Sequence, residues 1–181
     1  MLGVVFTEFT DMVEEAFGAE MLDSMITEVE SRLESGGAYT AVGTYHHNEI
    51  VLLVTQLAKL TGRDVDDLVE LFGEHLFGRF VERYPIFFEQ ITDSLDFLEA
   101  VENSIHFEVR KLYPNAELPS FICDRKAPEL LIMEYHSTRP FATLCRGLIK
   151  GCGKHHGQQL QIDESPLADG GPGMCFTIRR M

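Results

Sequence analysis

The chain of 181 residues carries 29 Asp and Glu against 15 Lys and Arg, which gives a net charge of −14 at pH 7. This acidic surplus argues against a general nucleic-acid-binding protein, which usually has a basic surface. Hydrophobic residues make up 45 % of the chain, so we expect a real core in one large domain or two small packed lobes. No apolar run reaches the roughly 18–20 residues of a membrane span, and the acidic N-terminal segment does not resemble a signal peptide.

The acidic surplus lies in the first part of the chain. Residues 1–103 hold 21 acidic and 5 basic residues, a net −16, whereas residues 104–181 hold 8 acidic and 10 basic residues, a net +2. We expect the acids of the first part to form a solvated face, with docking of a basic partner surface as the alternative.

Helices are predicted for most of the first 115 residues. Apolar residues repeat about every 3.6 positions in five stretches, over residues 4–17, 21–33, 48–60, 65–80 and 93–112. Asp64 is predicted to cap the fourth helix, Pro85 to end it and residues 87–91 to form a short helical piece.

Short strands are predicted for the rest of the chain. Strand-like runs cover residues 119–123, 130–136, 159–163 and 174–179, and turn residues stand at Asp124-Arg125 and at 169–173. One helix, from Phe141 to about His155, interrupts them. Helices followed by locally paired strands predict an α+β fold with a four-stranded antiparallel sheet.

Two groups of residues stand apart from the fold pattern. His106 lies beside the apolar stripe of the long predicted helix, where a histidine is usually structural, although a neutral imidazole can also ligate iron. In an extended chain, Tyr135, Ser137 and Arg139 point to one side and offer two hydroxyls and a guanidinium to a carboxylate or phosphate. Together the two groups indicate a b-type haem, with iron on the histidine and propionates on the polar trio.

The sequence resembles the haem–nitric oxide/oxygen-binding (H-NOX) family, the bacterial relatives of the soluble guanylate cyclase haem domain. The Tyr135-x-Ser137-x-Arg139 run matches the propionate-binding signature of that family, and His106 with the following Lys111, Tyr113 and Pro119 matches its proximal-histidine segment. Further similarity lies in the opening residues 1–6 and in residues 73–80. The resemblance covers essentially the whole chain.

The resemblance implies a single domain over residues 1–181, with a distal helical lobe over about 1–62 and a proximal lobe with the sheet over about 63–181. Haem b (Fe-protoporphyrin IX) would lie between the lobes, with His106 as the proximal iron ligand through Nε2. Tyr135, Ser137 and Arg139 would hold the propionates, and Pro119 would press on a pyrrole ring and distort the macrocycle. The implied lining of the distal pocket is apolar and consists of Val5, Phe9, Leu76, Phe80, Leu144 and Leu148.

This apolar lining bears on gas selectivity. Leu144 stands where oxygen-binding relatives place a tyrosine, and Leu76 replaces a polar residue. Because such a pocket offers bound O2 no hydrogen-bond donor, we expect NO and CO to bind and O2 to be excluded, unless Tyr84 or His75 supplies a donor. NO would release His106 from the iron and thereby signal to a separate partner, a histidine kinase or a cyclic-di-GMP enzyme.

Two other functions remain open. A haem enzyme of the peroxidase type would need distal acid–base groups, which the apolar lining does not supply. A haem-free interaction module would have the same fold, with His106 and the polar trio as relics. The favoured prediction is a cytoplasmic, non-catalytic sensor.

A zinc site is a further possibility at the end of the last predicted helix. Cys152, His155 and His156 form a Cys-x-x-His-His cluster. A further cysteine, either Cys145 or Cys175, would have to complete a zinc site there. Free or redox-responsive thiols in a reducing compartment are the favoured interpretation of these cysteines and of Cys123.

Overall fold

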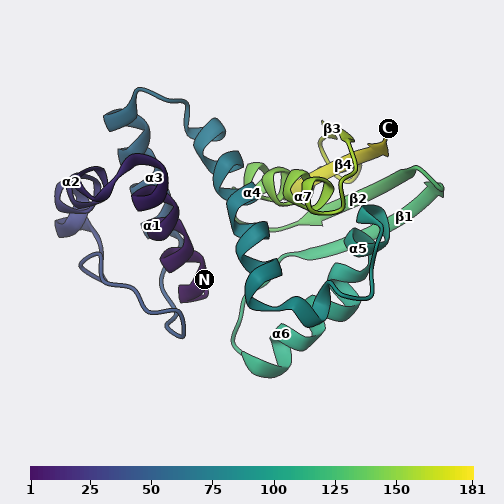
Figure 1. Ribbon diagram of the computed structural model, residues 1–181, viewed down its shortest axis with the longest axis horizontal. Coiled ribbons are helices and arrows are strands. Elements are labelled where there is room, and N and C mark those ends of the chain that lie inside the picture. The colour runs from purple at the N-terminus through teal and green to yellow at the C-terminus, as the bar shows by residue number, and fades with distance from the viewer.

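The computed structural model describes residues 1–181 and contains seven α-helices and four strands. Helices α1, α2 and α3 form one group, and the long helix α4 runs between this group and the rest of the molecule (Figure 1). The bounds of the helices are α1 Gly3–Phe17, α2 Ala19–Val29, α3 His47–Thr61, α4 Val65–Arg83, α5 Ser94–Ala100, α6 Phe107–Leu112 and α7 Ala142–His155. The strands are β1 Ser120–Ala127, β2 Leu130–His136, β3 Leu160–Ser165 and β4 Gly173–Arg180.

The core divides into two hydrophobic clusters, and α4 contributes to both. Leu68, Phe72 and Leu76 join the first cluster, which is otherwise built mostly from α1, α2 and α3. Phe77 joins the second cluster, which lies among α5, α7 and the sheet. Helix α4 can serve both because residues a few positions apart on a helix face different neighbours.

The strands form an antiparallel sheet in the order β1-β2-β4-β3. Alternate residues of β2, namely Leu131, Met133 and Tyr135, are buried against α5 and α7, as the two-residue period of a strand requires. The predicted α+β fold with a four-stranded antiparallel sheet is confirmed.

Helices α4 and α7 approach each other unusually closely. A Cβ atom built on Gly147 would lie 2.3 Å from the backbone oxygen of Glu70 and 2.8 Å from the Cα atom of Gly73, so only glycine fits at this crossing. Glu70 also pairs with Arg146 and Lys150. Burial raises the pKa of Glu70, but the hydrogen bonds and charges of Lys150 and Arg146 outweigh burial and leave this pKa lowered.

The capping prediction at Asp64 is confirmed, since its Oδ1 accepts a 2.8 Å hydrogen bond from the backbone N–H of Asp66. Two other predictions need correction. Residues 87–91 form no helix of their own, because the helical piece is a 3-10 turn over Pro85–Phe87. Residues 124–125 are not a turn but lie inside β1, where Arg125 is held by Asp96 and Glu99 of α5.

The predicted long helix over residues 93–112 is one continuous helical stretch with an interruption. It consists of α5, a π-helical turn over Val101–His106 and α6. Such turns occur frequently at functional sites. No helix combines the length and apolar character needed to cross a membrane.

Candidate cofactor site

His106 is the last residue of the π-helical turn, and its side chain is 13 % exposed. The ring Nδ1 atom lies 3.2 Å from Oε2 of Glu102, four residues earlier on the same face. Burial lowers the pKa of His106, and the hydrogen bond and charge of Glu102 oppose this without reversing it. The imidazole is therefore neutral at pH 7, and Nε2 has no side-chain partner.

Glu102 connects the helix that carries His106 with the sheet. Its Oε1 accepts a 2.7 Å hydrogen bond from Nη2 of Arg110, and its Oε2 accepts a 3.2 Å hydrogen bond from the backbone N–H of Phe121 in β1. Burial raises the pKa of Glu102, but the bonds from Arg110, His106 and Phe121 outweigh it and leave this pKa lowered. Sequence reasoning missed this residue, although its four-residue spacing from His106 was available as a signal.

The ring of Phe121 is a neighbour of both groups of residues that stood out in the sequence. Its centroid is 5.4 Å from that of His106 and 5.8 Å from that of Tyr135. Pro119 directly precedes β1, and its backbone carbonyl acts to raise the pKa of His106. The fold therefore brings His106, Pro119 and Tyr135 together, although they are far apart in the sequence.

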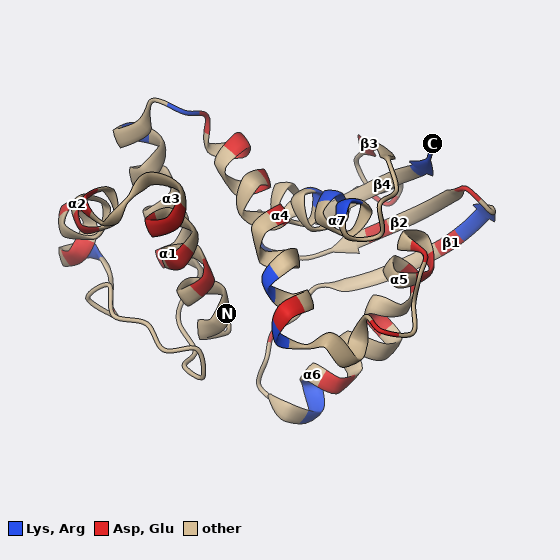
Figure 2. Ribbon diagram, in the orientation of Figure 1, with Lys and Arg blue, Asp and Glu red and all other residues tan.

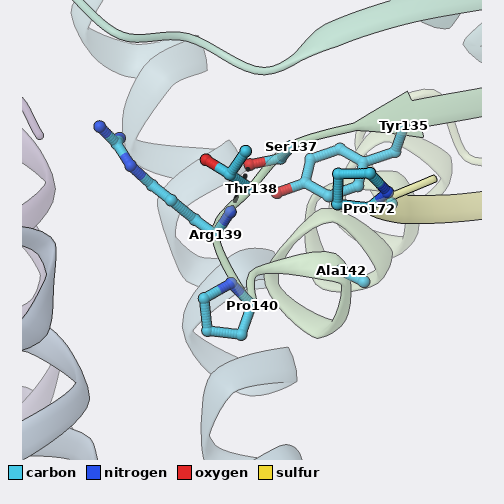
Figure 3. A pocket seen from close by; sticks show the side chains of 8 residues that line it. Tyr135, Ser137, Thr138, Arg139, Pro140, Ala142 and Pro172 are labelled. Atoms are coloured by element: carbon cyan, nitrogen blue, oxygen red, sulfur yellow. Dashed lines mark hydrogen bonds between the residues drawn. The ribbon is translucent and has the colours of Figure 1, made fainter.

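A cavity of about 270 Å³ opens at the end of β2 (Figure 3). Burial raises the pKa of Tyr135, so its hydroxyl remains protonated and can donate. The cavity is lined by Tyr135, Ser137, Thr138, Arg139, Pro140, Ala142, Pro172 and Gly173.

The guanidinium of Arg139 does not share the direction of Tyr135 and Ser137. It extends away from them (Figure 3), donates a 3.1 Å hydrogen bond from Nη1 to the backbone oxygen of Glu117 and pairs through Nη2 with the Glu117 carboxylate. The expectation of one shared side is wrong for Arg139, because β2 ends at His136 and the extended alternation ends with it. Glu117 is a second residue that sequence reasoning missed, since nothing in its loop identified a partner.

All six residues of the predicted distal lining belong to or pack against the first hydrophobic cluster. Phe9 and Leu76 are 1 % and 2 % exposed. The other four are partly buried and come from α1, α4 and α7: Val5, Phe80, Leu144 and Leu148.

The two alternative hydrogen-bond donors differ in position. The ring of Tyr84 lies 6.3 Å from that of Phe80. His75 has a buried Nε2 atom without a partner, but five residues along a helix correspond to about 140° of rotation. His75 therefore does not share the face of Phe80, whereas Tyr84 is a neighbour of Phe80.

The cysteines are free thiols. Sγ of Cys152 lies 3.7 Å from Nδ1 of His156 and 3.5 Å from the backbone oxygen of Ser94. No group of three or more His, Cys, Asp or Glu side chains is close enough to hold a metal ion. Burial raises the pKa of the Cys152 and Cys145 thiols, and that of Cys123 to about 11, so these three thiols are protonated at pH 7.

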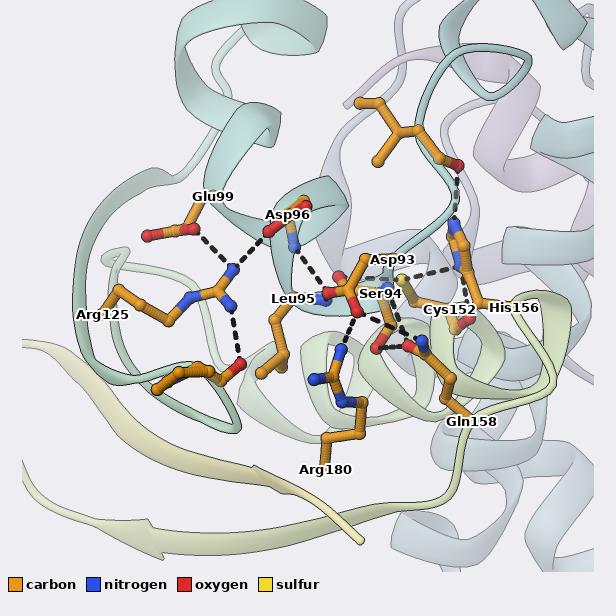
Figure 4. Close-up of polar contacts among 12 residues, drawn as sticks. Asp93, Ser94, Leu95, Asp96, Glu99, Arg125, Cys152, His156, Gln158 and Arg180 are labelled. Carbon is orange, nitrogen blue, oxygen red and sulfur yellow. Dashed lines mark hydrogen bonds and ion pairs between the residues drawn. The ribbon is translucent and has the colours of Figure 1, made fainter.

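The start of the helical stretch that leads to His106 is firmly anchored (Figure 4). Asp93 accepts from the backbone N–H groups of Leu95 and Asp96 and pairs with Arg180 of β4. The side-chain oxygen of Gln158 accepts from both the backbone N–H and the hydroxyl of Ser94, at 2.9 and 2.6 Å. This end of the stretch is therefore tied to the sheet.

A partly buried neutral imidazole whose Nε2 atom has no side-chain partner, an apolar lining and a polar cavity match what a site for haem requires: an axial ligand, an apolar surrounding and donors for the propionates. The residues present therefore fit a haem chemically.

Comparison with known proteins agrees with this class of site. A family model described as Haem-NO-binding matches residues 2–164. The crystal structure of the unliganded Fe(II) H-NOX protein from K. algicida has a TM-score of 0.90 and 38 % sequence identity, covering 100 % of this chain and 97 % of that one. The solution structure of the H-NOX protein from Shewanella woodyi, with bound IWP-051 in the Fe(II)CO state, has a TM-score of 0.85 and 38 % identity, covering 100 % and 95 %.

A curated relative is more distant. The soluble guanylate cyclase gcy-35 of Caenorhabditis elegans is 24 % identical over 143 residues, which is 77 % of this chain and 20 % of that protein. The chain thus spans about a fifth of the length of this relative. Because the family model matches most of its length, the chain belongs to the Haem-NO-binding (H-NOX) family.

Proposed function

We propose that this protein is a haem-based sensor of nitric oxide that also binds CO and excludes O2. The observation that carries the proposal is the contact series from His106 through Phe121 to Tyr135. A candidate iron ligand and a candidate propionate-binding residue are thus both neighbours of one phenylalanine ring. The CO-bound state of the S. woodyi protein supports gas binding in the family.

In this proposal, haem b lies between a distal lobe over about residues 1–62 and a proximal lobe over about 63–181. His106 holds the iron through Nε2, Pro119 presses on the macrocycle, and Tyr135, Ser137 and Arg139 hold the propionates. A ferrous haem held there supplies an iron centre that binds diatomic gases.

The distal lining decides between gases. Val5, Phe9 and Leu76, with the three other apolar residues of the lining, offer no hydrogen bond to a ligand that needs one. O2 would need a hydrogen-bond donor from these residues to be held stably, whereas NO would need little such help. The same lining supplies no acid or base, which argues against peroxidase chemistry and supports a non-catalytic role.

The chain signals through the helical stretch that carries His106. Asp93 pairs with Arg180 of β4, and the backbone oxygen of Ser94 accepts from Sγ of Cys152 in α7. Because this end of the stretch is anchored, release of His106 from the iron would move the α6 end, where Leu112 is 72 % exposed. A two-state element that a ligand biases in this way can be detected by a separate partner protein. In this proposal the protein is cytoplasmic, and the partner is a histidine kinase or a cyclic-di-GMP enzyme.

A visible spectrum of the purified ferrous protein tests the proposal. We expect a haem spectrum that changes with NO to that of a five-coordinate nitrosyl haem. CO should also change the spectrum, and air should give no stable O2 complex. A stable O2 spectrum or peroxide turnover would contradict the proposed selectivity. A colourless protein that takes up no added haem would favour the haem-free interaction module instead.

A further inference from the structure

The carboxylate group of Glu102 makes three contacts. It faces Nδ1 of His106 at 3.2 Å, and it accepts from Arg110 at 2.7 Å and from the backbone N–H of Phe121 at 3.2 Å. Its side chain is 21 % exposed, so water screens these contacts only in part.

These contacts determine the orientation of the His106 ring. A carboxylate that is paired with an arginine only accepts hydrogen bonds, so Nδ1 of His106 must carry the proton and donate. The lone pair of the neutral ring is then on Nε2, which is the atom that the proposed function assigns to iron. Because Glu102 is also bonded to β1, the ring direction is set relative to the sheet as well as along its own helix.

We infer that Glu102 is a positioning residue for the proximal ligand, one that fixes the tautomer of His106 and increases electron donation from Nε2 to iron. The inference rests on the proposed function. A carboxylate that accepts the second N–H of a ligating histidine raises the basicity of that ligand and holds its ring in place. Glu102 therefore sets the strength of the bond whose release transmits the signal, and after release it keeps His106 attached to β1.

The contacts of Glu102 also determine which parts of the helical stretch move together. Glu102 and His106 lie in the π-helical turn, whereas Arg110 lies in α6. The carboxylate thus bonds the turn to α6 on one side and to β1 on the other. We expect His106 to leave the iron as part of this bonded unit rather than by rotation of its ring alone.

The test replaces Glu102 by Gln in the full chain loaded with haem. Gln keeps the acceptor oxygen and the shape but removes the charge, so Nε2 donates less. We expect the Fe–His stretching band in resonance Raman spectra of the ferrous protein to move to lower wavenumber, the reduction potential to rise, and haem to be lost about 10-fold faster. Glu108→Gln is the matched control, since Glu108 lies in α6 of the same helical stretch and pairs with Lys111.

The outcomes separate the two proposals. Suppose that the wild-type protein shows an Fe–His band and that Glu102→Gln leaves the band and the reduction potential unchanged. This result would overturn the role of Glu102 and leave the proposed function intact. A wild-type protein that binds no haem would overturn both. If Glu108→Gln shifts the band as much as Glu102→Gln does, the effect is one of net charge and the positioning role is wrong. Glu102→Asp, with a shorter arm, is expected to give an intermediate shift, which a purely structural role would not produce.

Discussion

At the scale of single residues, Leu144 is the position where gas selectivity can be changed. It lies on α7, partly buried against the first hydrophobic cluster with Leu76 and Phe80. We predict that Leu144→Tyr introduces a hydrogen-bond donor beside the gas site, so that a stable O2 spectrum forms in air. Stopped-flow measurement of O2 dissociation from the ferrous protein checks this.

Leu71→Tyr is the control for Leu144→Tyr, because Leu71 is 38 % exposed and outside the predicted lining. Its spectrum should match that of the wild type in every gas. If Leu144→Tyr folds, binds haem and behaves like wild type with both O2 and NO, the assignment of α7 to the distal lining is wrong. Tyr84→Phe then tests the alternative donor beside Phe80.

Arg139 gives a second prediction at this scale. Its guanidinium pairs with Glu117, whose side chain is 78 % exposed, so a propionate and Glu117 compete for the same group. We predict that Glu117→Gln slows haem loss by up to about fivefold, since an exposed ion pair contributes about 0–1 kcal/mol. Transfer of haem to an excess of apomyoglobin measures the rate.

Glu129→Gln controls for net charge in the Glu117 experiment, because Glu129 lies in the same half of the chain and its side chain makes no ion pair. It should leave the rate of haem loss unchanged. Faster haem loss in Glu117→Gln would mean that Glu117 orients Arg139 for the propionate rather than competing with it.

At the scale of elements, the crossing of α4 and α7 holds the two clusters together. Gly147→Ala would place a methyl group 2.3 Å from a backbone oxygen, and overpacking of this kind destabilises by about 1–3 kcal/mol. Gly78→Ala on α4 is the matched control, since nothing lies within 4 Å of its added Cβ and alanine favours a helix by about 0.5–1 kcal/mol. Urea unfolding should show opposite signs for the two variants, and equal signs would contradict the close crossing.

The elements also show what sequence reasoning can reach. The helices and the four strands were predictable because apolar periodicity and caps such as Asp64 are local signals. The extent of β1 was not, because Arg125 stays in the strand through its pairs with Asp96 and Glu99 of α5. The same applies to the site: His106 and the Tyr135 segment were visible as motifs, whereas the partner of Arg139 depends on how a loop folds back.

At the scale of the whole molecule, 21 of the 29 acidic residues lie within residues 1–103, and the cations of α7 and the ends of the sheet belong to the rest of the chain (Figure 2). An uncharged gas gains nothing from these acids, and propionates would be held in the half whose net charge is +2. Some of the acids have structural partners across elements, as Glu8 of α1 shows with Arg79 and Arg83 of α4. The exposed remainder fits a solvated face.

Communication through the whole molecule depends on His106 in the proposed mechanism. We predict that His106→Gly supplied with imidazole retains haem, because imidazole replaces the ligand, but no longer couples the iron to the chain. Hydrogen exchange followed by mass spectrometry should show faster exchange in residues 101–112 of the wild type after NO is added, with little change in the anchored residues 94–100. The variant should show no response in either segment. A variant that responds to NO as the wild type does would refute release of His106 as the signal, since the helical stretch would then be moving without any bond to the iron.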